Sequence, residues 1–245
     1  MAGSRRRMHS PSVRAGRQLT LAFPSRWAGA RRNAGRKPGP RPNTPHRARP
    51  RHRAAEPVLV TLRSRLAALR SEFVFPSVRL ALVRAARRDP EQFRIVQFSV
   101  QRDHVHFIVE AASKDALSRG MQGVAIRIAR YVNDLLSRRG PLWNGRWHGR
   151  ALASPREVRN ALVYVLANFR KHARHALRTG IDPFSSAAWF DGWVEARASS
   201  GVPPPIAEPR GVEPESDPDA FTARTWLARV GWRRRGLIGL AEAPS

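Results

Sequence analysis

The stretch that most constrains the fold is an alternating run, Asp103-His104-Val105-His106-Phe107-Ile108-Val109-Glu110. A β-strand directs successive side chains to opposite faces of a sheet. Every second residue from Val105 to Val109 would face a hydrophobic core, and the other face would carry His104, His106, Ile108 and Glu110. Two imidazoles two residues apart on a strand are close enough to bind one divalent metal ion. A bare His-x-His pattern also fits two surface histidines, so its function depends on the rest of the chain.

The charge of the chain narrows the class of partner. Among 245 residues, 45 are Lys or Arg and 18 are Asp or Glu, which gives a net charge of +27. Such a charge favours a polyanionic binding partner, and nucleic acid is a stronger candidate than an anionic membrane. The absence of cysteine excludes disulfide frameworks, thiolate zinc sites and cysteine nucleophiles. Leu19–Phe23 is too short for the core of a signal peptide, and no apolar run could span a bilayer. We therefore expect a cytoplasmic, nucleoid-associated protein without a membrane partner.

The N-terminal part of the chain is basic and poor in apolar residues. Residues 1–53 contain fifteen Lys or Arg and no acid, and the first carboxylate is Glu56. Such a segment cannot bury enough apolar surface to offset the entropy lost on ordering. Residues 1–56 are therefore predicted to be a disordered basic arm, which either contacts phosphates or is a solvated tail.

The following residues predict a succession of strands and helices. Strands are predicted at 58–62 and 93–100, with a helix at 77–88 between them and a hairpin turn at 101–103 leading to the histidine strand. On the strand at 93–100, one face would carry Arg94, Val96, Phe98 and Val100. Ser113 would cap a long helix ending at Gly140-Pro141, and its buried stripe would be Leu117, Met121, Val124, Ile128, Val132 and Leu135.

The order of these elements predicts the fold class. The passage 142–152, rich in Trp and Arg, could end in an edge strand. The order is then strand, helix, strand, strand, helix, strand, which is the ferredoxin-like arrangement. We expect an α+β domain over 57–195, with an antiparallel sheet and helices packed on one of its faces.

A further helix has a strong start signal at Ser154-Pro155-Arg156-Glu157, a capping box with proline at the first helical position. Its core stripe would be Val158, Leu162, Val165 and Phe169. Tyr164 and Asn168 lie one turn apart and would project together from a flanking polar face.

The C-terminal part of the chain is irregular. Two tryptophans between Ser185 and Trp193 are expected to dock on the domain. Residues 196–220 include a Pro-rich, acidic stretch and are predicted to be a flexible linker. Residues 221–245 combine tryptophans with Arg233-Arg234-Arg235, and this C-terminal tail could pack back on the domain or touch nucleic acid.

The chain contains two tyrosines, Tyr131 and Tyr164. A phenol, with an ordinary pKa of about 10, attacks a phosphodiester only if it is deprotonated or if the phosphate is activated. A metal held by two histidines could polarise and orient that phosphate. A strand with a His-x-His pattern near a tyrosine on a helix could therefore cut DNA through a covalent phosphotyrosine intermediate. Tyr131 lies at the edge of a buried stripe, which favours packing over catalysis.

The sequence resembles the single-tyrosine HUH transposases, in particular the REP-associated, insertion-sequence-200-like group. The resemblance spans about 57–195 and is carried by His104-Val105-His106-Phe107-Ile108-Val109, by Leu142-Trp143 running into Arg146-Trp147-His148, and by Ala161-Leu162-Val163-Tyr164-Val165-Leu166-Ala167-Asn168. Many members carry Met-Pro-Asn before the first histidine, where this chain has Gln101-Arg102-Asp103. The resemblance implies a nuclease domain that cuts single-stranded or hairpin DNA and leaves a 5′-phosphotyrosine.

The resemblance also implies roles for particular residues. Tyr164 matches the nucleophile, while His104, His106 and Asn168 match the ligands of Mg²⁺ or Mn²⁺. Glu110 could substitute as a ligand or orient a histidine. Candidates for DNA contact are Arg102, Arg146, Arg150, Arg170 and Lys171. A non-catalytic nucleic-acid-binding protein that keeps the fold is the alternative, and the active form could be a monomer or a homodimer.

Overall fold

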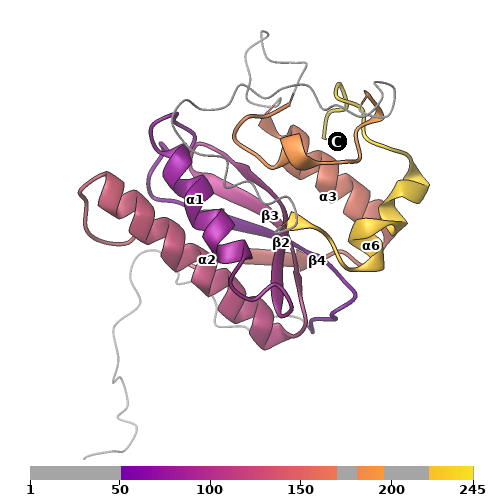
Figure 1. Cartoon of the computed structure of the whole chain (residues 1–245), viewed down its shortest axis with the longest axis horizontal. Helices are drawn as coiled ribbons and strands as arrows, with labels where there is room; N and C mark the ends of the chain where they lie inside the picture. Colours follow the sequence, from indigo (N-terminus) through magenta and orange to yellow (C-terminus); the bar gives the residue numbers. More distant parts are fainter. Residues whose placement is uncertain (1–50, 170–180, 196–220, 245) are drawn as a thin grey trace, which may run out of the picture. The chain divides into compact units, whose positions relative to one another are not determined.

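The computed structural model describes residues 51–169, 181–195 and 221–244. Most of the predicted basic arm and all of the predicted linker lie outside these ranges. Within them, four strands form one antiparallel sheet in the order β2-β3-β1-β4 (Figure 1). The strands are β1 (Val58–Arg63), β2 (Phe93–Val100), β3 (His104–Ala111) and β4 (His148–Ala151). This order and the helices between the strands confirm the predicted α+β, ferredoxin-like fold.

Two helices cover one face of the sheet. They are α1 (Phe75–Ala86) and α2 (Lys114–Leu135), and their buried residues share a core with Val60, Val105 and Phe107. Helix α1 begins two residues before the predicted start, because Pro76 takes a position in its first turn. The Ser113 side chain accepts a hydrogen bond from the Ala116 N–H at 3.1 Å, which confirms the predicted cap of α2.

A third helix, α3 (Pro155–Ala167), covers the opposite face of the sheet (Figure 1). Ser154 Oγ accepts a hydrogen bond from the Glu157 N–H at 3.3 Å, as the predicted capping box requires. Val158, Leu162 and Val165 of the predicted stripe are buried in a second core beneath α3, which includes Ile108 of β3. The sequence did not assign this helix to a face, and its position puts it over the histidine side of β3.

The prediction for the faces of β2 was wrong, because the strand contains a β-bulge. Ile95 pairs with Val109 and Gln97 pairs with Ile108, which leaves Val96 as an extra residue. One extra residue reverses the alternation beyond it. Val96 therefore lies in the second core, whereas Phe98 and Val100 lie in the first, under α1 and α2.

The C-terminal residues pack back on α3. They form α6 (Trp226–Arg229) and the short 3-10 helix η5 (Gly231–Arg235), while η3 (Ala187–Trp189) precedes them in the chain. Trp232 is only 1% exposed and its ring stacks on Phe190 at 5.4 Å, within the core beneath α3. Trp193 is also buried there, so the predicted docking of this region is confirmed. No helix among the described residues has the length and apolar composition needed to cross a membrane.

Candidate active site

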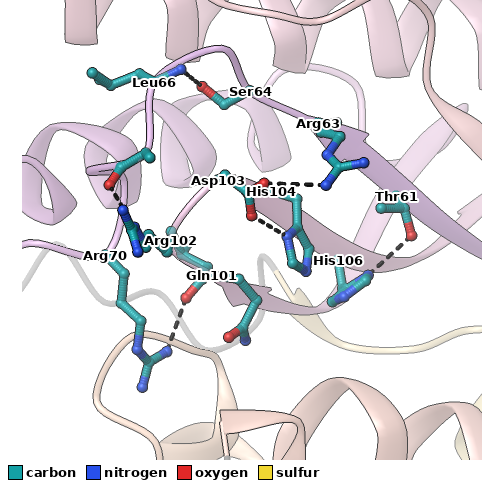
Figure 2. A network of polar contacts seen from close by, with 12 residues as sticks. Thr61, Arg63, Ser64, Leu66, Arg70, Gln101, Arg102, Asp103, His104 and His106 are labelled. Atoms are coloured by element: carbon teal, nitrogen blue, oxygen red, sulfur yellow. Dashed lines mark hydrogen bonds and ion pairs between the residues drawn. The ribbon is translucent and has the colours of Figure 1, made fainter. Parts of the chain in front are cut away.

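The two histidines lie side by side on the face of the sheet that α3 covers (Figure 2). Their ring centroids are 4.6 Å apart at an angle of 73°. His104 keeps 23% of its side chain exposed, whereas His106 is 2% exposed. Because residues two apart on a strand share a face, this arrangement follows directly from the alternation of β3. The pair offers two adjacent imidazoles, one open to solvent and one sheltered.

His106 is held by a residue of the neighbouring strand. Thr61 pairs with His106 across β1 and β3, and its Oγ1 lies 3.0 Å from His106 Nδ1 (Figure 2). When Nδ1–H donates to Thr61, Nε2 keeps the lone pair that a metal ion needs. Burial, and then the neighbouring His104, lower the pKa of His106 to about 3. His106 is therefore neutral near pH 7, the form in which an imidazole binds a metal.

His104 has a carboxylate partner beside it in the chain. Asp103 Oδ1 lies 2.8 Å from His104 Nδ1, and Asp103 Oδ2 lies 3.4 Å from Arg63 (Figure 2). The hydrogen bond with His104, and then the charges of His104 and Arg63, lower the pKa of Asp103 against the opposing effect of burial. A carboxylate on the far nitrogen orients a ligating histidine and raises its basicity. Asp103 thus gives His104 the kind of support that Thr61 gives His106.

The sequence did not identify Thr61 or Asp103 as functional residues. Thr61 could be found only from the register of β1 against β3, since it lies 45 residues before His106. Asp103 had a signal in the sequence, because it directly precedes His104 in the short turn that leads to the histidine strand. We read both as positioning residues for the histidine pair.

Tyr164 of α3 lies directly over His106. Its hydroxyl oxygen is 3.3 Å from His106 Nε2, and the two ring centroids are 4.8 Å apart. The two residues are 58 positions apart in the chain, so the packing of α3 on β3 brings them together. The tyrosine that sequence analysis favoured therefore lies within hydrogen-bond reach of the histidine pair.

Tyr131, the rival tyrosine, lies on the opposite face of the sheet. It packs against the first core, and Arg84 Nη1 donates a hydrogen bond to its hydroxyl. The ring of Tyr131 also receives the Arg84 guanidinium at 5.5 Å from its centroid. The sheet itself separates Tyr131 from the histidines.

Asn168 lies at the C-terminal end of α3 and is 3% exposed. Its side chain makes no hydrogen bond to another residue of the described ranges, which is uncommon for a buried amide. No three His, Cys, Asp or Glu side chains of the described part of the chain gather as a metal site. A third ligand to the histidine pair would therefore be an amide such as Asn168, a water molecule or a DNA oxygen. The donor set fits a divalent cation that accepts mixed nitrogen and oxygen ligands.

Glu110 has a structural role, which argues against the alternative of a metal ligand. Its Oε2 accepts the Arg224 N–H at 2.8 Å, and its Oε1 accepts the N–H and hydroxyl of Thr225 at 3.0 and 2.8 Å. Thr225 in turn caps α6. Glu110 thus anchors the C-terminal segment on β3.

Of the five candidate DNA-contacting residues, the structure describes Arg102, Arg146 and Arg150, and all are exposed. Arg150 and His148 pair with Leu59 and Thr61 on β1, so both lie on the histidine face of the sheet. Arg150 donates to Glu157 at 2.9 Å. Arg102 lies in the hairpin turn that leads to the histidines, and it donates to the Ala67 carbonyl at 3.3 Å. Arg170 and Lys171 lie outside the described residues.

Two solved structures show the kind of protein this chain is similar to. One is a REP-associated tyrosine transposase bound to a REP hairpin, 16% identical, with a TM-score of 0.45 over 58% of this chain and 82% of that one. The other is a Deinococcus radiodurans R1 protein described as a transposase, 17% identical, with a TM-score of 0.33 over 42% of this chain and 85% of that one. No curated protein matches the chain.

The family comparison concerns the middle of the chain. Residues 63–154 match the family "Transposase IS200 like". This stretch holds the histidine strand and its hairpin, and it ends before the helix that carries Tyr164. Residues 63–154 of this chain are therefore similar to the IS200-like transposase family.

Proposed function

We propose that this protein cuts and rejoins single-stranded DNA, with Tyr164 as the nucleophile and a divalent metal ion held by His104, His106 and Asn168. The observation that carries the proposal is the 3.3 Å contact between the Tyr164 hydroxyl and His106 Nε2. It joins the only tyrosine on the histidine face of the described sheet to the candidate metal ligands.

The chemistry is a reversible exchange of phosphodiester bonds. The Tyr164 oxygen loses its proton to solvent and attacks phosphorus, the bond from phosphorus to the 3′ oxygen breaks, and the departing 3′ oxygen takes a proton from solvent to become a hydroxyl. The protein is then joined to DNA through a 5′-phosphotyrosine. Attack by the free 3′-hydroxyl on that phosphotyrosine reverses the step and releases Tyr164.

The low pKa of His106 supports a role in metal binding rather than in proton transfer. With a pKa of about 3, His106 is too weak a base to take the phenol proton efficiently near neutral pH. A bound Mg²⁺ or Mn²⁺ would polarise the scissile phosphate and so reduce the need for a strong base. Thr61 and Asp103 keep the two imidazoles in fixed orientations at hydrogen-bond distances of 3.0 and 2.8 Å.

The surroundings of the site suit a DNA substrate. The net charge of +27 favours a polyanion, and Arg150 lies on the same face of the sheet as the histidines. Arg102 and Arg146 add exposed positive charge on the loops next to β3 and β4. We propose that these three residues, with Arg170 and Lys171, contact the DNA backbone. The likeness of residues 63–154 to the IS200-like transposases supports a single-stranded or hairpin substrate.

A second candidate is a protein that binds DNA without cutting it. The observation in its favour is that the family match ends at residue 154, before the tyrosine helix. Such a protein would keep the fold and the charge of the family. It would bind DNA in a way that salt reverses, without a metal-dependent covalent product.

The experiment is a covalent-adduct assay with labelled single-stranded hairpin DNA, with and without Mn²⁺. The wild-type protein should give a shifted band that survives denaturant only when Mn²⁺ is present. Tyr164→Phe should abolish that band and leave DNA binding nearly unchanged, because it removes only the hydroxyl. Tyr131→Phe is the matched control and should behave as the wild type.

Two outcomes would count against the proposal. An adduct that persists in Tyr164→Phe and disappears in Tyr131→Phe would assign the chemistry to the other tyrosine. Reversible binding by the wild type, with no adduct at any Mn²⁺ concentration, would favour the non-catalytic candidate.

A further inference from the structure

A groove of ≈360 Å³ lies beside Tyr164, and we call it the Tyr164 groove. Its apolar lining comes from Leu59 of β1 and from Ala161 and Val163 of α3. Its polar lining comes from Arg150 and Asn160, together with Tyr164 itself. Asn160 and Tyr164 are four residues apart on α3 and therefore project from the same side of the helix.

The opposite wall of the groove is the end of the chain, residues 242–244. Arg159 of α3 fixes this wall, because its guanidinium donates to the two carboxylate oxygens of Glu242 at 2.6 and 2.8 Å. The same guanidinium donates to the Gly236 and Leu237 carbonyls at 3.0 and 2.9 Å. A bidentate pair with further backbone contacts is a strong and well-oriented anchor. The groove is therefore bounded on both sides by fixed elements.

The charges around the groove favour a neutral group. The one positive side chain of its lining, Arg150, already pairs with the Glu157 carboxylate at 2.9 Å. The lining also includes the carboxylate of Glu242, which pairs with Arg159. A phosphate in the groove would therefore approach the Glu242 carboxylate, and the one guanidinium group of the lining, that of Arg150, is already paired. An uncharged base avoids that cost, and it gains from the apolar lining, from the Tyr164 ring and from the Asn160 amide.

We propose that the Tyr164 groove receives the base of the nucleotide next to the scissile phosphate. This inference rests on the proposed function, since it needs the phosphate to lie at the Tyr164 hydroxyl. A base in the groove would be unstacked from its neighbours in the strand and would lie against the apolar lining. The Asn160 side chain has one donor group and one acceptor group, so it can hydrogen-bond to the edge of one base better than to the others. Asn160 is then a specificity-determining residue.

The test compares hairpin substrates that differ only in the bases on the two sides of the cleaved bond. For each substrate, the rate of adduct formation is measured at DNA concentrations below KM, in the presence of Mn²⁺. The wild type should prefer one base at one flanking position, and an abasic nucleotide there should react more slowly. Asn160→Ala should reduce the preference by about tenfold, since one amide contact to a base edge is lost. Asn160 is exposed, so this substitution leaves the cores of the protein intact.

Two further variants distinguish a specific effect of the groove on base preference from a general effect of substitution. Gln122→Ala removes an exposed amide from α2, on the other face of the sheet, and should keep the wild-type preference. Arg159→Ala releases the wall and should also weaken the preference.

The outcomes distinguish this inference from the proposed function. If the wild type shows no base preference at either flanking position, or Asn160→Ala keeps it unchanged, the groove does not bind the base. If the wild type forms no adduct with any substrate, the proposed function fails, and the inference fails with it.

Discussion

The two faces of the sheet each carry one tyrosine in very different surroundings. Tyr131 of α2 lies against the first core and has the Arg84 guanidinium as its partner. Tyr164 of α3 lies over His106, in a row that continues to Thr61 on the neighbouring strand. The helix pattern predicted Tyr131 at the edge of a buried stripe and Tyr164 on a flanking polar face, and the structure adds the partner of each hydroxyl.

The face of the sheet on which a tyrosine lies therefore determines which groups its hydroxyl contacts. On the face covered by α1 and α2, the strands present Val60, Val105 and Phe107. On the face covered by α3, the same strands present Thr61, His104 and His106. A phenol on the first face meets apolar side chains and a cation, whereas a phenol on the second meets a neutral imidazole. Substitutions at four residues test this contrast, and they follow in order of decreasing effect.

Replacing either histidine should have the largest effect. His104→Ala and His106→Ala should each lower the rate of Mn²⁺-dependent adduct formation by about a hundred- to a thousandfold, because a lost ligand removes several kcal/mol of charge stabilisation. Single-turnover rates on labelled hairpin DNA measure the change. His52→Ala is the control, since its ring contacts the Ala111 carbonyl at the far end of β3. Unchanged cleavage in both histidine variants would show that the histidine face has no special role in the reaction.

Removing the hydroxyl of Thr61 should have an intermediate effect. Thr61→Val keeps the shape of the side chain but loses the 3.0 Å contact with His106 Nδ1. Loss of such an orienting contact lowers metal affinity by about 10- to 100-fold. The Mn²⁺ concentration at half-maximal cleavage measures this affinity. Thr61→Ser keeps the hydroxyl and should restore most of it, whereas equal losses in Ser and Val variants would point to packing.

Removing the partner of Tyr131 should have the smallest effect. Arg84→Ala deletes the donor to the Tyr131 hydroxyl, and both groups lie near the surface. The free energy of unfolding should change by no more than about 0.5 kcal/mol, and adduct formation should stay at the wild-type rate. Denaturant unfolding and the adduct assay measure the two quantities. A large loss of cleavage here would show that the α1 and α2 face also serves the reaction.

Much of the fold could be predicted because its signals are local. The alternation of β3, the short turn at 101–103 and the caps at Ser113 and Ser154 each depend on a few neighbouring residues, and the structure confirms them. The bulge at Val96 could not be predicted, because pairing with β3 decides it and the sequence of β2 alternates equally well without it. The role of Glu110 was missed for a related reason, since its partners lie 114 and 115 residues further along the chain.

The residues that could act were identifiable from the amino-acid sequence: two histidines on one strand face, two tyrosines on two helices, and a strong positive charge. These features follow from composition and from the periods of strands and helices, which any short segment displays. Only the tertiary structure decided that α3 covers the histidine face, that Thr61 and Asp103 orient the imidazoles, and that residues 242–244 close a groove beside Tyr164. The physical reason is that each of these contacts joins separate elements or their connecting turns, and packing alone selects which surfaces meet.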